Sequence, residues 1–291
     1  MDIVETIARK NCINEKFYNG KPMDKEQRLF MSDNYVIKIY YPKKYNYYYN
    51  ELNVYNGLRT KSYIPRLFYC GEENDYKYII ISRENGKSLF DLWNKLSYYD
   101  KIKYLKDMAI IIKDINNLRS GVVDFKNIIK EEYNCSIKKI NYTCDTLNII
   151  NKIFDDNIDY INNSEKSSLI HIDTHFYNFM VNKNGKLIAY DFENIVDAPI
   201  DYQFVRLYRM NYYPESFIYP KDSLTQKQID EYKIILPTII QSYPEIIMKN
   251  TDYRLKVYLL NYLLKEVIRC KIPEDKAKEI IFKNQKIKLR G

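Results

Sequence analysis

The chain has 291 residues, of which 46% are hydrophobic and 29% are charged. This length is typical of two lobes, and the apolar fraction excludes a disordered chain. The net charge of +8 is spread along the sequence without a block of five like charges, which favours a mixed, solvated surface over a nucleic-acid-binding patch.

The first eighty residues are predicted to form mostly strands. Short aromatic or β-branched segments, separated by turn residues, predict strands at residues 15–20, 27–32, 35–41 and 76–82. Between the third and fourth strands, Tyr48, Leu52, Tyr55 and Leu58 recur at helical spacing. Glu51 lies on the same stripe, where a lone carboxylate is costly unless it is paired.

The composition changes near Ser82–Gly86, and the chain beyond it is mostly helical. Amphipathic patterns predict helices near residues 99–118, 230–243, 252–270 and 273–284. We therefore expect an α+β fold with a small β-rich N-terminal lobe, residues 1–84, and a larger helical C-terminal lobe, residues 85–291.

Residues 169–194 interrupt the helical pattern with a predicted β-hairpin. Apolar and polar residues alternate around Asn184 and Gly185, the strongest short hairpin signal, which predicts a type I′ turn. Counting outward from this turn places Asn178 opposite Asp191. Opposed residues share one face of a hairpin, so an amide oxygen and a carboxylate are expected side by side.

The oxygen groups in this segment indicate a site for a hard cation. Asn178 and Asp191 are expected to be neighbours, with Asp173 on the loop before them, and such oxygen ligands suit Mg²⁺. Zinc is not expected, because His171 and His175 lie on an irregular loop without further close ligands. His171 is interpreted as a hydrogen-bonded brace, and His175 has no assigned role.

The segment "HIDTHFYNFMV…LIAYDFE" resembles the catalytic and metal-binding motifs of the aminoglycoside phosphotransferase and choline kinase group, which has a protein-kinase-like two-lobe fold. The family pattern is His-x-Asp-x-x-x-x-Asn, a short hairpin, then Asp-x-Glu or Asp-x-Asp. The resemblance implies that Asp173 is the catalytic aspartate, which orients an acceptor hydroxyl and takes its proton. It also implies that Asn178 and Asp191 hold Mg²⁺ on the phosphates of ATP or GTP.

The resemblance extends to the first lobe and implies that this lobe binds the nucleotide. Lys38 in "YVIKIYY" would pair with the phosphates, and Glu51 would be its partner. Val36 lies on the same strand face as Lys38 and would pack on the base. Backbone groups near Ser82 and Glu84, in the segment between the lobes, would also contact the base.

Some positions remain open or depart from the family. The phosphate-covering loop has only Gly20, so Lys21 or Lys25 is the alternative phosphate contact. Glu193 is either a further metal ligand or a member of a structural ion pair. Asp201, at a predicted helix start, is expected to brace the catalytic loop.

Three functions are compatible with these residues: a small-molecule phosphotransferase, an atypical protein kinase, and a non-catalytic nucleotide-binding module. Only ten positions separate Asp191 from Asp201, too few for the peptide-docking segment of protein kinases. No key polar group is lost, which disfavours the non-catalytic alternative. The leading prediction is therefore transfer of a γ-phosphoryl group to a hydroxyl of a small molecule.

The acceptor pocket is expected in the helical region beyond Arg209, but no motif there identifies the acceptor. Residues 211–291 contain 15 basic and 10 acidic side chains, a balance that disfavours polycations such as aminoglycosides. Choline-like cations would need an aromatic cage, and tyrosines are too frequent throughout to be diagnostic.

The cellular setting follows from the cysteines and the apolar pattern. The five cysteines are scattered and form no CxxC pair, so neither a disulfide framework nor a zinc site is expected. There is no signal-peptide pattern, and no apolar run approaches the roughly 18 residues that cross a bilayer. We expect a cytoplasmic protein with a nucleoside triphosphate and a small hydroxyl acceptor as partners, and without nucleic-acid or membrane partners.

Overall fold

The structure is a computed structural model that describes residues 3–19, 27–217, 224–283 and 289. It contains two compact units whose segments alternate along the chain. The first unit comprises Met1–Leu118 and Asp173–Ile195, and the second comprises Arg119–Ile172 and Val196–Gly291. The expected lobe boundary after residue 84 falls within the first unit and stays a prediction.

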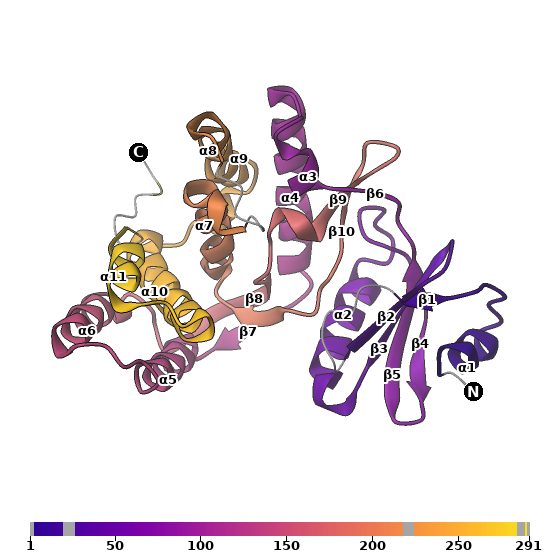
Figure 1. Cartoon of the computed structure of the whole chain (residues 1–291), viewed down its shortest axis with the longest axis horizontal. Coiled ribbons are helices and arrows are strands. Elements are labelled where there is room, and N and C mark those ends of the chain that lie inside the picture. The colour runs from indigo at the N-terminus through magenta and orange to yellow at the C-terminus, as the bar shows by residue number, and fades with distance from the viewer. Residues whose placement is uncertain (1–2, 20–26, 218–223, 284–288, 290–291) are drawn as a thin grey trace. The chain divides into compact units, whose positions relative to one another are not determined.

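The first unit is built around a five-stranded antiparallel sheet (Figure 1). In spatial order its strands are β1 (Tyr18–Asn19), β2 (Gln27–Met31), β3 (Tyr35–Tyr40), β5 (Tyr76–Ser82) and β4 (Leu67–Glu73). Four of them lie where the sequence predicts strands. Strand β4 is not predicted, because its side chains are all exposed or half-buried and show no apolar alternation.

The helices of this unit begin at hydroxyl caps or pack against the sheet. They are α1 (Ile3–Lys10), α2 (Tyr45–Gly57), α3 (Leu89–Trp93) and α4 (Tyr98–Asn116), with the 3₁₀ turns η1 (Pro42–Lys44) and η2 (Phe176–Asn178). Ser88 caps α3 and Ser97 caps α4, each accepting a hydrogen bond of 3.1 Å from the backbone N–H three residues on.

Strand β3 presents two chemically different faces, as its period of two dictates. Ile37 and Ile39 are buried in an apolar cluster that includes side chains of α1. Lys38 and Tyr40 face the other way, and the Tyr40 ring packs edge-on against Tyr48 of α2 at 5.8 Å. The sheet therefore lies between α1 and α2 (Figure 1). The side chain of Lys38 projects from its α2 side, where it contacts Glu51.

A second, three-stranded sheet joins the chain after β5 to the hairpin of residues 179–189. Its order is β10 (Leu187–Ala189), β9 (Phe179–Asn182) and β6 (Gly86–Ser88). Strand β6 approaches β9 so closely that a Cβ on Gly86 would lie 2.2 Å from the carbonyl oxygen of Val181. Only glycine fits this approach, which holds the segment leaving β5 against the hairpin.

The second unit is mostly helical around a small sheet. Its strands are ordered β11 (Ile195–Ala198), β8 (Glu165–His171) and β7 (Ser120–Val123). Its helices are α5 (Phe125–Ile137), α6 (Cys144–Ile158), α7 (Phe204–Tyr212), α8 (Gln226–Tyr232), α9 (Ile235–Ser242), α10 (Thr251–Cys270) and α11 (Glu274–Lys283), with η3 (Ile200–Gln203), η4 (Pro214–Phe217) and η5 (Pro244–Ile246). Among the described residues, no helix combines the length and the apolar character needed to cross a membrane.

A buried ion triad fixes α10 in this unit. Arg254 is 2% exposed and donates to Asp201 Oδ2 and to Glu165 Oε1, both at 2.6 Å. The sequence predicts that Asp201 braces the catalytic loop, which stays a prediction; its side chain bonds side chains of α10. The residue that bonds the end of β8 is Gln203, whose Nε2 donates to the carbonyl of His171 at 2.9 Å.

Candidate active site

Lys38 on β3 and Glu51 on α2 form a buried ion pair. Their Nζ and Oε1 atoms are 2.5 Å apart, Lys38 is 6% exposed and Glu51 is completely buried. Glu51 shares its helical stripe with Tyr48 and Tyr55, which are both buried where α2 packs on the sheet. The contact predicted from the sequence is therefore present, and the spacing of apolar residues on α2 is its cause.

Two further carboxylates surround the same ammonium group. Nζ of Lys38 lies 3.3 Å from Asp191 Oδ1 and 3.2 Å from Glu193 Oε1. Burial raises the pKa of Glu51 to about 8, although Lys38 opposes this rise. Burial lowers the pKa of Lys38, but the carboxylates of Glu51 and Asp191 outweigh it, and its pKa is well above the ordinary value. The ammonium is therefore held in its charged form.

Glu193 therefore forms an ion pair with Lys38, which is one of the two roles expected for it. Its other expected role, as a metal ligand, stays a prediction. Ligand oxygens of Glu51, Asp191 and Glu193 all lie within 4.8 Å of one another, a spacing that can hold a metal ion. With Glu51 protonated below its pKa of about 8, ionised carboxylates of Asp191 and Glu193 around one ammonium would leave one negative charge in excess. A cluster with this excess attracts a divalent cation, with Lys38 as the competing positive charge.

Helix α2 also holds the segment that follows Asp191. Nδ2 of Asn50 donates to the carbonyl oxygen of Glu193 at 2.7 Å. The ring of Phe192 is fully buried and contacts the Tyr55 ring edge-on at 5.5 Å. Asn50 has no predicted role in the sequence, and its position directly before Glu51 on the same helix is the only signal that could have indicated one.

The predicted pairing of Asn178 with Asp191 is wrong by one residue. Strand β9 pairs Phe179 with Ala189, and the N–H of Tyr190 donates to the carbonyl of Asn178 at 3.1 Å. Neither of the two predicted partners lies in a strand, because Asn178 ends η2 and Asp191 has a left-handed backbone with φ of 67°. They approach the same cavity from a turn and from a bend.

The side chain of Asn182 explains this register. Its Oδ1 accepts hydrogen bonds of 3.0 Å from the N–H groups of both Asn184 and Lys186. The loop thus has three residues, 183–185, in place of the predicted two. Gly185 adopts φ of 70°, as in three-residue hairpins that end in a left-handed position.

The loop that carries Asp173 is closed by hydrogen bonds to its backbone. The carbonyl oxygen of Asp173 accepts from the N–H of His175 at 2.8 Å and from Nδ2 of Asn178 at 2.9 Å. Because the amide nitrogen of Asn178 is used in this way, its amide oxygen is the group that can bind a cation. Nε2 of His175 lies 3.5 Å from Oδ1 of Asp173.

These residues meet at a cavity of about 700 Å³ that lies entirely in the first unit. Its wall combines apolar side chains with the predicted polar ones: Leu29, Met31, Val36, Lys38, Tyr55, Pro65, Ile81, Ser82, Arg83, Glu84, Asn85, Gly86, Asp173, His175, Tyr177, Asn178, Met180, Tyr190 and Asp191. Every predicted site residue except Glu51 lines it, and Glu51 reaches it through Lys38. Such a volume is typical of small-molecule sites.

The segment after β5, where backbone groups near Ser82 and Glu84 are expected to contact a base, contains both bonded and unbonded backbone donors. The N–H groups of Ser82 and Arg83 donate to carbonyl oxygens at 2.8 Å, and Oγ of Ser82 donates to the Glu84 carboxylate at 2.8 Å. The N–H groups of Glu84 and Asn85, by contrast, make no hydrogen bond within the described ranges. Free donors for a base therefore begin at Glu84.

Sequence reasoning missed the apolar wall of the cavity. Leu29 is the cross-strand partner of Lys38, and Met31 and Ile81 are the two partners of Val36. Directly opposed residues share a face of a sheet. Aligning the predicted strands around Val36 and Lys38 would have indicated these residues. The predicted loop contacts Gly20, Lys21 and Lys25 lie outside the described residues.

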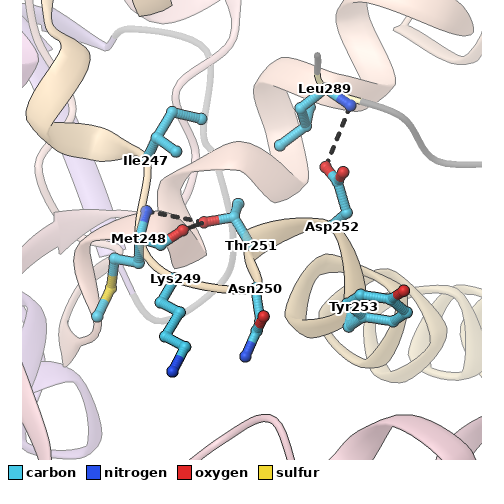
Figure 2. A pocket seen from close by; sticks show the side chains of 8 residues that line it. All are labelled: Ile247, Met248, Lys249, Asn250, Thr251, Asp252, Tyr253 and Leu289. Carbon is cyan, nitrogen blue, oxygen red and sulfur yellow. Dashed lines mark hydrogen bonds between the residues drawn. The ribbon is translucent and has the colours of Figure 1, made fainter. Parts of the chain in front are cut away.

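The second unit has a hollow of about 470 Å³ at the start of α10, in the region where an acceptor pocket is expected (Figure 2). The N–H of Met248 donates to Oγ1 of Thr251 at 2.8 Å, and the N–H of Leu289 donates to Oδ1 of Asp252 at 3.1 Å. The described part of its lining contains one carboxylate, that of Asp252, whereas the carboxylates of three residues surround Lys38.

No protein-family model matches the chain, and no curated protein matches it in sequence. Solved structures do match it over nearly its whole length. A thermostable mutant of aminoglycoside phosphotransferase APH(4)-Ia, in complex with ADP and hygromycin B, matches with a TM-score of 0.66 at 13% identity, covering 99% of this chain and all of that one.

Two further structures broaden the comparison. The streptomycin–ATP complex of APH(2")-IIa has a TM-score of 0.66 at 16% identity and covers 97% of this chain and 96% of that one. Ethanolamine kinase from Plasmodium vivax has a TM-score of 0.57 at 12% identity, covering 98% and 87%. The expected fold is thus confirmed: the chain has the kinase-like fold shared by aminoglycoside phosphotransferases and an ethanolamine kinase.

Proposed function

We propose that the chain is a phosphotransferase that moves the γ-phosphoryl group of ATP or GTP to a hydroxyl group of a small molecule. The observation that carries this proposal is the single cavity that gathers Lys38, Asp173, Asn178 and Asp191 beside an apolar wall. Phosphoryl transfer depends on positioning and charge stabilisation, and these are the groups that it needs. Structures of similar fold, named as complexes with nucleotides and aminoglycosides, support both partners.

The base of the nucleotide would occupy the apolar part of the cavity. Val36, Ile81 and Met180 line it, and they offer flat contact to a purine ring. The N–H groups of Glu84 and Asn85 would supply hydrogen bonds to the ring edge. Glu84 belongs to the segment expected to contact the base, and Asn85 directly follows it.

The phosphates and their metal would lie at the charged part of the cavity. Among the described residues nothing donates to the amide oxygen of Asn178, and Asp191 offers a carboxylate; hard oxygen ligands of this kind fit Mg²⁺. A bound Mg²⁺ would neutralise charge on the transferred phosphoryl group. Lys38 would donate to the phosphates, while Glu51 keeps the ammonium group in place.

Asp173 would orient the acceptor hydroxyl and accept its proton. Its backbone carbonyl accepts two hydrogen bonds, from His175 and Asn178, which fix the loop from which its side chain lines the cavity. A positioned carboxylate is sufficient for this role, because the attacking oxygen needs alignment more than activation.

A small acceptor is favoured over a peptide. From Asp191 the chain passes through β11 directly into η3, which starts at Ile200, so no long activation segment separates them. The non-catalytic alternative would require the loss of a polar group at the site, and each of Lys38, Asp173, Asn178 and Asp191 is in place on the cavity wall.

A transfer screen tests the proposal and separates the alternatives. The purified chain would be incubated with Mg²⁺ and γ-labelled ATP or GTP against aminoglycosides, choline, homoserine, sugars, nucleosides and a mixed protein substrate. The expected result is acceptor-dependent formation of a labelled phosphate ester of a small molecule. Label on protein alone would establish the protein kinase alternative, and nucleotide binding without any transfer would establish the non-catalytic one.

A further inference from the structure

The first unit contains a second cavity, of about 380 Å³, between α4 and the tip of the β9–β10 hairpin. Its apolar lining comes from Tyr63, Ile110, Ile111 and Leu187. Ile110 is 52% exposed, whereas its neighbour Ile111 on the same helix is buried. None of these residues lines the candidate active site.

The walls of this cavity are bonded to one another. Nζ of Lys103 on α4 donates to the carbonyl oxygen of Gly185 at the hairpin tip at 3.0 Å. Nζ of Lys186 donates to Oγ of Ser62, next to Tyr63. The hairpin tip, the helix and the loop before β4 are thus linked, so the cavity is pre-formed and a ligand would bind without first ordering its walls.

Three charged side chains line the cavity, those of Lys103, Asp107 and Lys186, and within the described residues they form no ion pair with one another. Asp107 lies in the field of Lys103 and Lys186, yet its carboxylate has no hydrogen bond and no ion pair within the described part of the chain. Each lysine makes one hydrogen bond to a neutral oxygen and keeps further N–H donors. The cavity therefore offers two cationic donors, one anionic acceptor and an apolar floor, with a net charge of about +1 when all three are ionised.

We propose that this cavity binds a small organic anion that has an apolar or aromatic body, an acid group and a hydrogen-bond donor. The acid group, a carboxylate or a phosphate monoester, accepts charge-assisted hydrogen bonds from Lys103 and Lys186. The body packs on Ile110 and its apolar neighbours, and the donor is bound by Asp107. The volume suits a ligand of this size and exceeds what a few water molecules fill.

The proposal is tested by titration calorimetry and ligand-detected NMR on the full chain with para-aminobenzoate, benzoate, phenyl phosphate and aniline. Para-aminobenzoate has all three features, benzoate and phenyl phosphate lack the donor, and aniline lacks the acid. We expect saturable binding of the acids, tightest for para-aminobenzoate, and none of aniline. Binding should persist with ATP and Mg²⁺ present, because the active-site cavity is separate, and it does not depend on any phosphotransferase activity.

Substitutions separate the contributions of the individual side chains to ligand binding. Lys103→Gln and Lys186→Gln should each weaken binding of the acids by about five- to ten-fold, the range for a partly exposed charged partner. Asp107→Asn should lower the affinity for para-aminobenzoate to that for benzoate, and it should not lower the affinity for benzoate. Ile110→Glu, at an exposed position that folding does not need, should weaken every acid by repulsion. Lys106→Gln, an exposed lysine on the same helix outside the cavity, is the matched control and should change nothing.

Thermal unfolding of each variant shows that the fold is retained. Absence of saturation by all three acids would overturn the proposal. Equal affinities in the wild type and in both lysine variants, or displacement of the acids by ATP, would also overturn it.

Discussion

The ammonium of Lys38 lies 3.3 Å from the carboxylate of Asp191, so the residue proposed for the phosphates and the residue proposed for the metal contact each other directly. Each would change partners when a nucleotide and Mg²⁺ bind: Lys38 would donate to phosphate oxygens, and Asp191 would bind the cation. The nucleotide alone offers no cation to Asp191, and Mg²⁺ alone offers no phosphate oxygens to Lys38. Binding of the two should therefore be coupled.

The first prediction is mutual enhancement of nucleotide and Mg²⁺ affinity, as linkage requires of two coupled ligands. Asp191→Ala should abolish the effect of Mg²⁺ on nucleotide affinity, because it removes the negative ligand. Asn178→Ala should reduce it less, because a neutral amide contributes less charge. Calorimetric titration of nucleotide with Mg²⁺ and with a chelator measures the effect, and equal affinities in both conditions would show that no metal is shared.

The second prediction concerns the stability of the Lys38–Glu51 pair. Lys38→Met leaves buried carboxylates without their cation and should lower the free energy of unfolding by about 3–5 kcal/mol. Glu51→Leu should cost less, because Asp191 and Glu193 still surround Lys38. The double variant should cost less than the sum, with a coupling of about 1–3 kcal/mol in denaturant unfolding. Additive losses would mean that the two side chains do not interact.

The third prediction is a pH dependence that arises from Glu51. Burial raises the pKa of this carboxyl from 4.5 in the unfolded chain to about 8 in the folded one. As pH rises, the unfolded chain loses this proton before the folded chain does. The contribution of Glu51 to the free energy of unfolding is therefore complete below about pH 4.5 and is lost as pH rises through about 8. The raised pKa of Lys38 acts in a window above 10.5 and does not cancel this trend.

Thermal unfolding followed by circular dichroism between about pH 5 and pH 8 checks this prediction. The Tm of the wild type should fall across this range more steeply than that of Glu51→Gln, which has no titrating group at the position. Parallel curves for the two proteins would contradict the assigned pKa direction.

The fourth prediction tests the ion triad of the second unit. Arg254→Met should lower the free energy of unfolding by about 3–5 kcal/mol, because it leaves Asp201 and Glu165 buried without a cation. Arg269→Met on the same helix is the control: its side chain is 71% exposed and pairs only at the surface with Glu266, so its effect should be within about 0.5 kcal/mol. Urea titrations of both variants distinguish a buried network from a surface one.

Local patterns in the sequence were sufficient for the parts of the site that depend on one element. The period of two on β3 placed Val36 and Lys38 on one face, and the helical period of α2 turned Glu51 toward them. Both rules depend only on residues within a few positions of each other, and the structure reproduces both contacts.

The register of the hairpin could not be predicted from its turn dipeptide alone. Asn184 and Gly185 favour a two-residue turn, but the side chain of Asn182 bonds two backbone N–H groups and selects a longer loop. The left-handed backbone of Asp191 is also not evident in the sequence, because such a conformation in a residue other than glycine depends on tertiary contacts. The position of Asp191 beside Lys38 therefore depends on the fold.

The central claim is that Asp173 serves phosphoryl transfer at the cavity that also holds Lys38 and Asp191, and Asp173→Asn tests it most directly. With an acceptor from the screen, the variant should bind nucleotide with unchanged affinity while kcat falls by roughly 10²–10⁴, the range for a positioned acid–base group. Steady-state transfer of γ-labelled phosphate, with calorimetry of nucleotide binding on the same samples, gives both values. An unchanged kcat in a variant that still binds nucleotide would contradict the assignment of Asp173 and, with it, the proposed site of transfer.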